Sequence, residues 1–490
     1  MLSQYTSTST LSDNVVPSVY KETYVFENVN TSIVNGIRRI LLSELPHIAM
    51  DHTTINNTNT IIQKNTSCLH NEMIINRLAL TPLNNTHPLL KIKTFWDQQQ
   101  QKRVCSFLHP ELIPTVHLDV TNSKHLNFNN QDMLSVTPEN FVLLYSPETQ
   151  SEITQKGMNT ATVMDDLFVL DTITNEHCLL LYLKPTSSEE DFQRLQLSAK
   201  PIVGTGQDYA SFSQVGTVQF ENIPNVGEEQ NRAFQQKVAT INAERKTKDL
   251  KPLTETQMKT ERTIFDTLDA QRVFFSNQFG EPNKIKLTIQ SINNKSANQL
   301  LFDAIQWYIL ILKDFNKALK NTGYNSVHPK ERDDVQKMEW IQSTTQMKNA
   351  CELDINHDTH TVGNLLSTFC KILYVDENRE EMISKNVPKG VLDFVSYNMP
   401  HPLHNKIRIR MKLNEEKATE AFKILRPDET PLSHVSHQRN KMCSILLSEC
   451  VEYIIVTYLQ PLSNLLQERD GSVKDTQCFQ AVEQNVHVQV

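Results

Sequence analysis

A helix of about four turns is predicted over residues 30–46 by the spacing of its apolar positions. Asn30 opens a run of residue types that cap helix N-termini, and Pro46 ends the pattern. The adjacent Arg38 and Arg39 carry charges that need water or an acidic partner. The apolar stripe itself consists of four aliphatic residues at helical intervals, Ile33, Ile37, Ile40 and Leu41.

The same design occurs a second time in residues 357–373. Asp358 and Thr359 are the expected caps, and Asn364 matches Asn35 of the first helix. The second apolar stripe consists of Val362, Leu365, Leu366, Phe369 and Leu373. The chain is therefore predicted to contain this capped helix twice.

A long amphipathic helix follows each copy. The first is capped by Ser296, and its stripe is Leu300, Leu301, Ala304, Ile305, Tyr308, Leu312 and Phe315. The second covers about 438–466 with a bend at Pro461, and its stripe is Met442, Ile445, Leu446, Cys450, Ile454, Tyr458, Leu462 and Leu466. Two such units can pair about a pseudo-twofold axis. We expect this pairing to use Leu301, Ile305, Tyr308 and Leu312 against Leu446, Cys450, Ile454 and Tyr458.

The strand pattern predicts an α+β fold of two dimerisation units, each an antiparallel sheet with helices, paired as an intramolecular pseudo-dimer. Short alternating segments such as 116–120 and 141–145 predict a β-rich insert in the first unit. The expected division is a disordered tail 1–18, a first unit 19–95 and 278–320, an insert 96–226, a polar helical connector 227–277, a linker 321–338, a second unit 339–468 and a tail 469–490. The linker would keep the units at an effective concentration of order millimolar.

Composition limits the classes of function. A formal net charge of −8 argues against a chain that wraps nucleic acid by itself, because that requires a basic surface. No apolar run approaches the roughly 20 residues of a membrane span, and the first residues lack the charged and apolar regions of a signal peptide. We therefore expect an intracellular protein without a membrane partner.

Residues that could carry chemistry are scattered. The eight cysteines contain no Cys-x-x-Cys pair, which favours reduced, mostly buried thiols. Histidines three residues apart could share a metal in an alternative metallohydrolase, but no adjacent Glu supplies a general base. These pairs are His357/His360, His401/His404 and His434/His437. We expect no catalytic residue, no cofactor and no metal site.

Two pairs of motifs resemble known polymerase chains. Residues 33–46 (IVNGIRRILLSELP) and 71–83 (NEMIINRLALTPL) resemble the signature of the third-largest subunit of multisubunit DNA-directed RNA polymerase, a family that includes the D-like chain of archaea and the bacterial alpha amino-terminal domain. Residues 357–366 (HDTHTVGNLL) and 395–403 (VSYNMPHPL) resemble its small archaeal-L-like partner.

The resemblance implies that both partners of an alpha-like heterodimer are fused in one chain. Such a dimer acts in transcription as a non-catalytic platform on which the two largest, catalytic subunits assemble, with small zinc-binding subunits as further partners and no direct sequence-specific DNA contact. By position, the resemblance assigns the subunit contact to Arg38, Arg39, Glu44 and Arg77.

The sequence departs from the family in two places. Many third-largest subunits carry a cysteine cluster for zinc or iron–sulfur, whereas this insert contains only Cys105 and Cys178. The segment 227–277 has no counterpart that can be aligned. Fused versions are familiar from large DNA viruses, which implies the host cytoplasm, as a viral factory, and the virion; a cellular source would imply the nucleus. The alternative is a dimerisation scaffold of alpha-like fold outside transcription.

Overall fold

The computed structural model describes the two paired sheets, their helices and most of the segment between residues 46 and 226. The described residues are 6–7, 21–53, 59–84, 90–97, 102–123, 133–144, 167–171, 174–186, 192–292, 295–325, 337–342, 350–356, 360–377, 387–427, 436–469 and 479–481. The predicted caps Asp358 and Thr359, most of the tail 1–18 and most of the linker 321–338 lie outside them.

The first sheet has four antiparallel strands in the order β1-β2-β14-β13. They are β1 (Thr6–Ser7), β2 (Lys21–Glu27), β14 (Lys284–Ser291) and β13 (Val215–Asn222). Helix α1 (Thr31–Arg39) follows β2 and continues as the π-helical turn η1 (Ile40–Glu44), and α7 (Ala297–Asn321) follows β14. Both helices contact β14 through apolar side chains, which confirms the predicted capped helix and the predicted long helix.

The second sheet repeats this order as β15-β16-β18-β17. Its strands are β15 (Met338–Ile341), β16 (Ala350–Asn356), β18 (Lys406–Leu413) and β17 (Leu392–Asn398). Helix α8 (His360–Cys370) follows β16 and also continues as a π-helical turn, η9 (Lys371–Val375). After β18 come α9 (Glu415–Leu425), α10 (Ser436–Ile454), the π-helical turn η10 (Ile455–Leu459) and α11 (Gln460–Arg469).

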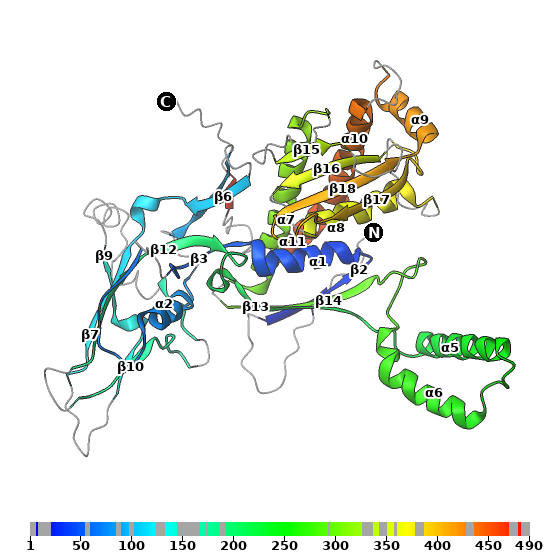
Figure 1. Cartoon of the computed structure of the whole chain (residues 1–490). Helices are drawn as coiled ribbons and strands as arrows, with labels where there is room; N and C mark the ends of the chain where they lie inside the picture. The colour runs from blue at the N-terminus through cyan, green and yellow to red at the C-terminus, as the bar shows by residue number, and fades with distance from the viewer. Residues whose placement is uncertain are drawn as a thin grey trace.

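The helices form two layers between the two sheets. Helix α1 contacts α8, and α7 contacts α10, η10 and α11, while the first sheet lies on the side of α1 opposite to α8 (Figure 1). One continuous apolar core joins both halves, from Tyr24 in β2 to Leu466 in α11. Burying the two helix layers against each other is favourable because each removes an apolar stripe from water.

A second core lies apart from the helix layers, in the part of the chain drawn around β7 and α2 in Figure 1. It contains the sheet β4-β11-β7-β9 and the pairs β12–β3 and β10–β8. The elements are β3 (Pro46–Met50), β4 (Thr60–Asn65), α2 (Asn71–Ala79), η3 (Pro110–Leu112), β7 (Thr115–Thr121), β8 (Leu134–Val136), η4 (Pro138–Asn140), β9 (Phe141–Leu144), β10 (Leu181–Leu183), β11 (Arg194–Ala199), β12 (Pro201–Thr205) and η6 (Ala210–Phe212).

These pairings correct the expected boundaries of the insert. The expected insert 96–226 includes β13, but β13 pairs with β14 over the whole segment 215–222 and so belongs to the first sheet. Strand β3 pairs with β12, and β4 with β11, so the second core begins near residue 46 rather than 96. Local alternation predicts a strand but not its partner, which is why the sequence misassigned these segments.

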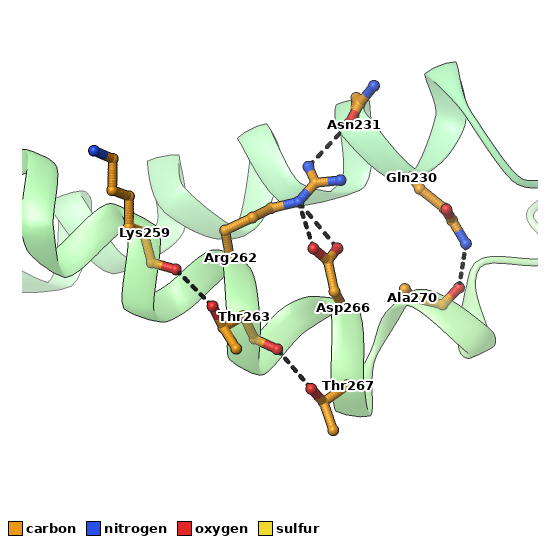
Figure 2. A network of polar contacts seen from close by, with 8 residues as sticks. All are labelled: Gln230, Asn231, Lys259, Arg262, Thr263, Asp266, Thr267 and Ala270. Carbon is orange, nitrogen blue, oxygen red and sulfur yellow. Dashed lines mark hydrogen bonds and ion pairs between the residues drawn. The ribbon is translucent and has the colours of Figure 1, made fainter.

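A hairpin of two helices, α5 (Glu228–Thr247) and α6 (Glu255–Leu268), followed by η7 (Ala270–Arg272), projects away from both cores (Figure 1). Arg262 donates to Asn231 at 2.9 Å and pairs with Asp266 at 3.0 Å, as Figure 2 shows. Its guanidinium also lies 5.0 Å from the ring centroid of Phe234. The helices expected in the connector 227–277 are therefore present, and they are held together by these polar and cation–π contacts and by the edge-to-face pair of Phe234 with the buried Phe265.

The end of the chain contains an element that the sequence analysis missed. Within the expected tail 469–490, β19 (Phe479–Ala481) pairs in parallel with β5 (Ile92–Asp97), which in turn pairs with β6 (Lys102–Phe107).

The helical segment Ser436–Gln467 is long and apolar enough to span a membrane, contrary to the expectation that no such run exists, but 61% of its most apolar window is buried inside the fold. That burial is typical of a core helix.

Candidate subunit interface

Helix α1 is fixed at its start by a side-chain cap. The Asn30 carboxamide oxygen accepts hydrogen bonds from the Ser32 backbone nitrogen at 2.9 Å and from the Ser32 hydroxyl at 2.7 Å. The predicted stripe residues Ile33, Ile37, Ile40 and Leu41 are all buried. Cap and stripe together determine which face of α1 is turned away from the first sheet.

Arg39 lies at the crossing of α1 and α8. Its Nε donates to the Thr361 hydroxyl at 2.9 Å, and that hydroxyl donates to Glu44 Oε1 at 3.3 Å. Thr361 is 4% exposed. Thr361 therefore brings together Arg39 and Glu44, two of the four predicted contact residues. Both residues take part in the contact between α1–η1 and α8 within the chain.

Arg38 lies against the first sheet. Its Nε donates to the backbone carbonyl of Val218 in β13 at 3.3 Å. Both Arg38 and Arg39 are half-buried, and among the described residues no hydrogen bond or ion pair involves the terminal nitrogens of either guanidinium. These nitrogens could bind a carboxylate in the bidentate geometry that arginine favours.

A glycine permits close packing beneath this surface. A Cβ atom on Gly36 would lie 2.8 Å from ring carbons of Tyr308 on α7, which is too close for real atoms. The second unit has a similar contact, where a Cβ on Gly363 of α8 would lie 2.5 Å from the nearest ring carbon of Tyr397 on β17. Helices α1 and α8 thus both need a glycine where an aromatic ring crosses them.

The long helices form the centre of the joint between the two sheets. Polar contacts cross it at several points: Gln306 donates to Ser463 at 2.6 Å, Ser448 donates to Asn316 at 2.6 Å, and Asn316 donates to Glu452 at 3.4 Å. The eight residues expected to pair the helices are all buried: Leu301, Ile305, Tyr308, Leu312, Leu446, Cys450, Ile454 and Tyr458. The interface is therefore apolar at its core with polar contacts along its length.

Arg77 belongs to a different surface. It is exposed on α2, where one terminal nitrogen donates to the Leu179 carbonyl at 3.0 Å. Helix α2 contacts β3 and β4 of the second core. The structure groups Arg38, Arg39 and Glu44 on the α1–η1 segment and places Arg77 on a separate element.

The titratable groups of the joint are not suited to catalysis. Burial raises the pKa of Cys443 and of Cys450, and hydrogen bonds to Cys351 and Cys370 respectively raise them further. Burial also raises the pKa of Tyr308, with a smaller contribution from the Glu44 charge. Thiols and phenols with raised pKa values remain protonated and are poor nucleophiles.

No metal-binding arrangement of three or more His, Cys, Asp or Glu residues occurs in the described ranges. His401 and His404 have ring centroids 5.0 Å apart, and His401 Nδ1 already accepts from the Leu403 backbone nitrogen at 3.2 Å. His357 and His434, the first members of the other two pairs, lie outside the described residues.

Thr361 is the residue at this interface that the sequence analysis did not single out. It lies within the motif of residues 357–366, one residue after His360. Its hydroxyl could have been predicted to contact another polar group, because a threonine inside an apolar helix needs a polar partner. Local spacing could not identify that partner, since Arg39 is 322 residues away.

Comparison with known proteins gives one family match. The model of the RNA polymerase Rpb3/Rpb11 dimerisation domain matches residues 23–309 of this chain, which is more than half of its length. The matched range covers most of β2, all of β13 and β14, the second core, the helical hairpin and the first half of α7, and it ends before the second sheet.

Individual relatives agree with this match. DNA-directed RNA polymerase subunit Rpo3 of Pyrobaculum aerophilum is 40% identical over 73 residues, 15% of this chain and 25% of that relative. RPAC1 of RNA polymerases I and III from Saccharomyces cerevisiae is 25% identical over 199 residues, 41% of this chain and 52% of the relative. Subunit 3 of RNA polymerases II, IV and V from Arabidopsis thaliana is 22% identical over 300 residues, 58% of this chain and 82% of the relative. The chain thus spans about a quarter of the length of the Pyrobaculum aerophilum relative and about half of the length of the Saccharomyces cerevisiae relative.

Proposed function

Since this chain belongs to the RNA polymerase Rpb3/Rpb11 dimerisation domain family, we propose that it is a non-catalytic assembly subunit of a multisubunit DNA-directed RNA polymerase. In this role it presents a surface on which the two largest subunits assemble, and those subunits supply the catalytic residues. The relatives named as polymerase subunits support the assignment.

The chain combines both partners of an alpha-like heterodimer. The observation that carries this proposal is the repeated order of elements: strand, helix that continues as a π-helical turn, two strands and long helix, with α9 added before the long helix of the second half and corresponding strands in corresponding places in both sheets. The first unit corresponds to the D-like partner and the second, residues 337–469, to the L-like partner. The two units then pair as an intramolecular pseudo-dimer through α1, α7, α8 and α10.

Arg38 and Arg39 contact a large subunit through their terminal guanidinium nitrogens. The Nε atoms hold the two side chains against Val218 and Thr361, which reduces the conformational entropy that binding would otherwise cost. Glu44 orients Thr361 and so acts behind the arginines, while Arg77 contacts a partner at a second surface on α2.

The part of the chain with its own core acts as an insert domain of the first unit. Its apolar residues cluster separately from those of the helix layers, and its boundaries follow the pairing of β3 with β12 near residues 46 and 205. The helices of 227–277 connect β13 to β14 and lie outside both cores, as a site for additional contacts.

The proposed partners are the two catalytic subunits and small zinc-binding polymerase subunits, without sequence-specific DNA contact and without a membrane. The net charge of −8 is consistent with a subunit that leaves DNA binding to others. The fusion of D-like and L-like units suggests a large DNA virus, with the protein in the cytoplasmic viral factory and the virion; a cellular source would place it in the nucleus.

Co-purification tests this function. The tagged full chain is co-expressed with the two largest polymerase subunits of the same source, and the complex is isolated by the tag and by gel filtration. We expect the two large subunits to co-elute and the complex to extend RNA on a tailed DNA template. Co-elution of neither large subunit would contradict the proposal and favour a scaffold outside transcription.

A further inference from the structure

A groove runs between the C-terminal half of α7 and the π-helical turn η10. Its volume is about 470 Å³, and its apolar floor includes Ile455 and Val456, the latter 62% exposed. The remaining lining residues are Lys313, Asn316, Lys317, Lys320, Asn321 and Glu452. An exposed valine in a hollow, surrounded by polar side chains, is an apolar contact that the fold itself does not use.

Positive charge is concentrated along one wall. Lys313, Lys317 and Lys320 are spaced by four and three residues, so they lie on one side of α7, and all three are exposed. Among the described residues none of them forms an ion pair. Like charges at this spacing destabilise a helix, so they are unfavourable here without a negatively charged partner.

The only carboxylate in the lining is already engaged. Glu452 accepts a hydrogen bond from Asn316 at 3.4 Å across the groove, and Asn316 also accepts from Ser448. On the adjacent face of α7, Asp314 pairs with Arg103 of β6 at 2.7 Å. The groove therefore keeps a local positive charge in a chain whose net charge is −8.

Both units build this groove. Its lysine wall belongs to α7 of the first unit, and its floor belongs to η10 of the second, so it exists only when the long helices are packed together. A ligand that binds there recognises the paired state of the two units rather than either unit alone.

We propose that the groove binds an acidic segment of another protein, with carboxylates on the three lysines and an apolar side chain on Val456. Charge complementarity and the apolar floor favour a peptide over nucleic acid. A single-stranded nucleic acid would need aromatic side chains for base stacking, and no aromatic residue lines the groove. This inference does not depend on the polymerase assignment, because it uses only the groove of the isolated chain.

Fluorescence anisotropy tests the proposal with the full chain and a short fluorescein-labelled peptide of repeated Asp-Glu-Leu units. The groove variant carries Lys313→Gln, Lys317→Gln and Lys320→Gln. The matched control carries Lys246→Gln, Lys248→Gln and Lys251→Gln in the helical hairpin, where all three lysines are also exposed. We expect the groove variant to weaken binding about tenfold or more, since each exposed charge pair contributes about half a kcal/mol, and the control to bind normally.

Two further measurements test the apolar contact. Val456→Asp, and a peptide with Ser in place of Leu, should each weaken binding to a similar extent. Equal losses in the groove and control variants would overturn the proposal, as would tighter binding of a single-stranded oligonucleotide of equal charge that depends on the same lysines. Circular dichroism and thermal unfolding show that each variant is folded, and Lys317→Gln alone serves if the triple variant is not.

Discussion

Arg39 on α1 donates a hydrogen bond to Thr361 on α8 at 2.9 Å, which joins a helix of the first unit to a helix of the second. The arginine expected to face only a partner chain therefore also stabilises the joint within its own chain. Mutations of the arginine pair must therefore be read for this bond within the chain as well as for the proposed contact with a partner.

Thr361→Val tests the joint directly. The variant keeps the shape of the side chain but removes the acceptor for Arg39 and the donor to Glu44. We expect the free energy of unfolding to fall by about 1–3 kcal/mol, because Arg39 and Glu44, two charged groups, each lose a hydrogen bond to Thr361. Urea unfolding measures the change, and Thr361→Ser, which keeps the hydroxyl, should lose less. Equal losses in the two variants would show that the hydroxyl contributes nothing.

Charge reversal separates the two roles of the arginines. Arg38→Glu should leave the isolated chain nearly as stable as wild type, because only one bond to a backbone carbonyl is lost, but should block co-elution with the large subunits. Arg39→Glu should block co-elution and should also destabilise the isolated chain, because it removes the hydrogen bond to Thr361 and places a negative charge near Glu44. Lys246→Glu with Lys248→Glu is the control for charge alone. Normal assembly of Arg38→Glu would exclude that residue from the subunit contact.

Gly36→Ala tests the packing of α1 on α7. The new methyl would meet the Tyr308 ring at 2.8 Å. Overpacking of this kind costs about 1–3 kcal/mol, and we expect a lower midpoint of thermal unfolding. Gly216→Ala is a matched control, because its Cβ would lie at an ordinary 3.6 Å from Ile292. If Gly36→Ala combined with Tyr308→Leu is no more stable than Gly36→Ala with Tyr308 intact, the steric explanation is wrong.

The buried ion pair of α7 gives a pH-dependent prediction. Lys295 and Asp303 are 2.8 Å apart and almost fully buried. Lys295→Met leaves an unpaired buried carboxylate, which should cost about 3–5 kcal/mol at neutral pH. Burial raises the pKa of Asp303, and Lys295 opposes this rise.

Without Lys295 the Asp303 carboxyl of the folded state stays protonated over a wider pH range above its ordinary pKa of 3.8. The free energy of unfolding should therefore fall more steeply than in wild type as pH rises through that range. Urea unfolding at several pH values measures this slope. A loss that is the same at acidic and neutral pH would contradict an ionised, unpaired Asp303, and Lys295→Met with Asp303→Leu should recover most of the stability.

The attachment of the β5–β6 hairpin to α7 can be tested separately. Arg103 binds Asp314 through two nitrogens at 2.7 and 2.8 Å. Asp314→Asn should increase amide hydrogen exchange in β5 and β6 and leave exchange in β16 and β18 unchanged, because the second sheet does not share this contact. Asp266→Asn in the helical hairpin removes a more exposed arginine pair and serves as the control.

Local chemistry was sufficient to predict the capped helices and their buried faces. Asn30 and Ser296 both cap helices in the structure, and the stripe from Leu300 to Phe315 is buried as predicted. These features depend on residues within one or two turns of each other, so a single sequence contains the information.

Features that depend on distant residues were not predictable in this way. The partner of β13 and the start of the second core depend on pairing between segments far apart in the chain. Strand β15 was missed because its four residues are all buried and show no alternation. Helix α9 had an available signal in Asn414, whose side chain accepts from the Lys417 backbone nitrogen, followed by two glutamates.

The contact between Gln306 and Ser463 also bears on how the chain is made. The two residues are 157 positions apart, so at synthesis rates of about 5–20 residues per second Ser463 follows Gln306 by roughly 8–30 s. For most of that interval the apolar stripe of α7 has been synthesised but α10, which packs against it, has not. During translation the apolar stripe of α7 must therefore be shielded from water by the first sheet or by a chaperone until α10 has been synthesised.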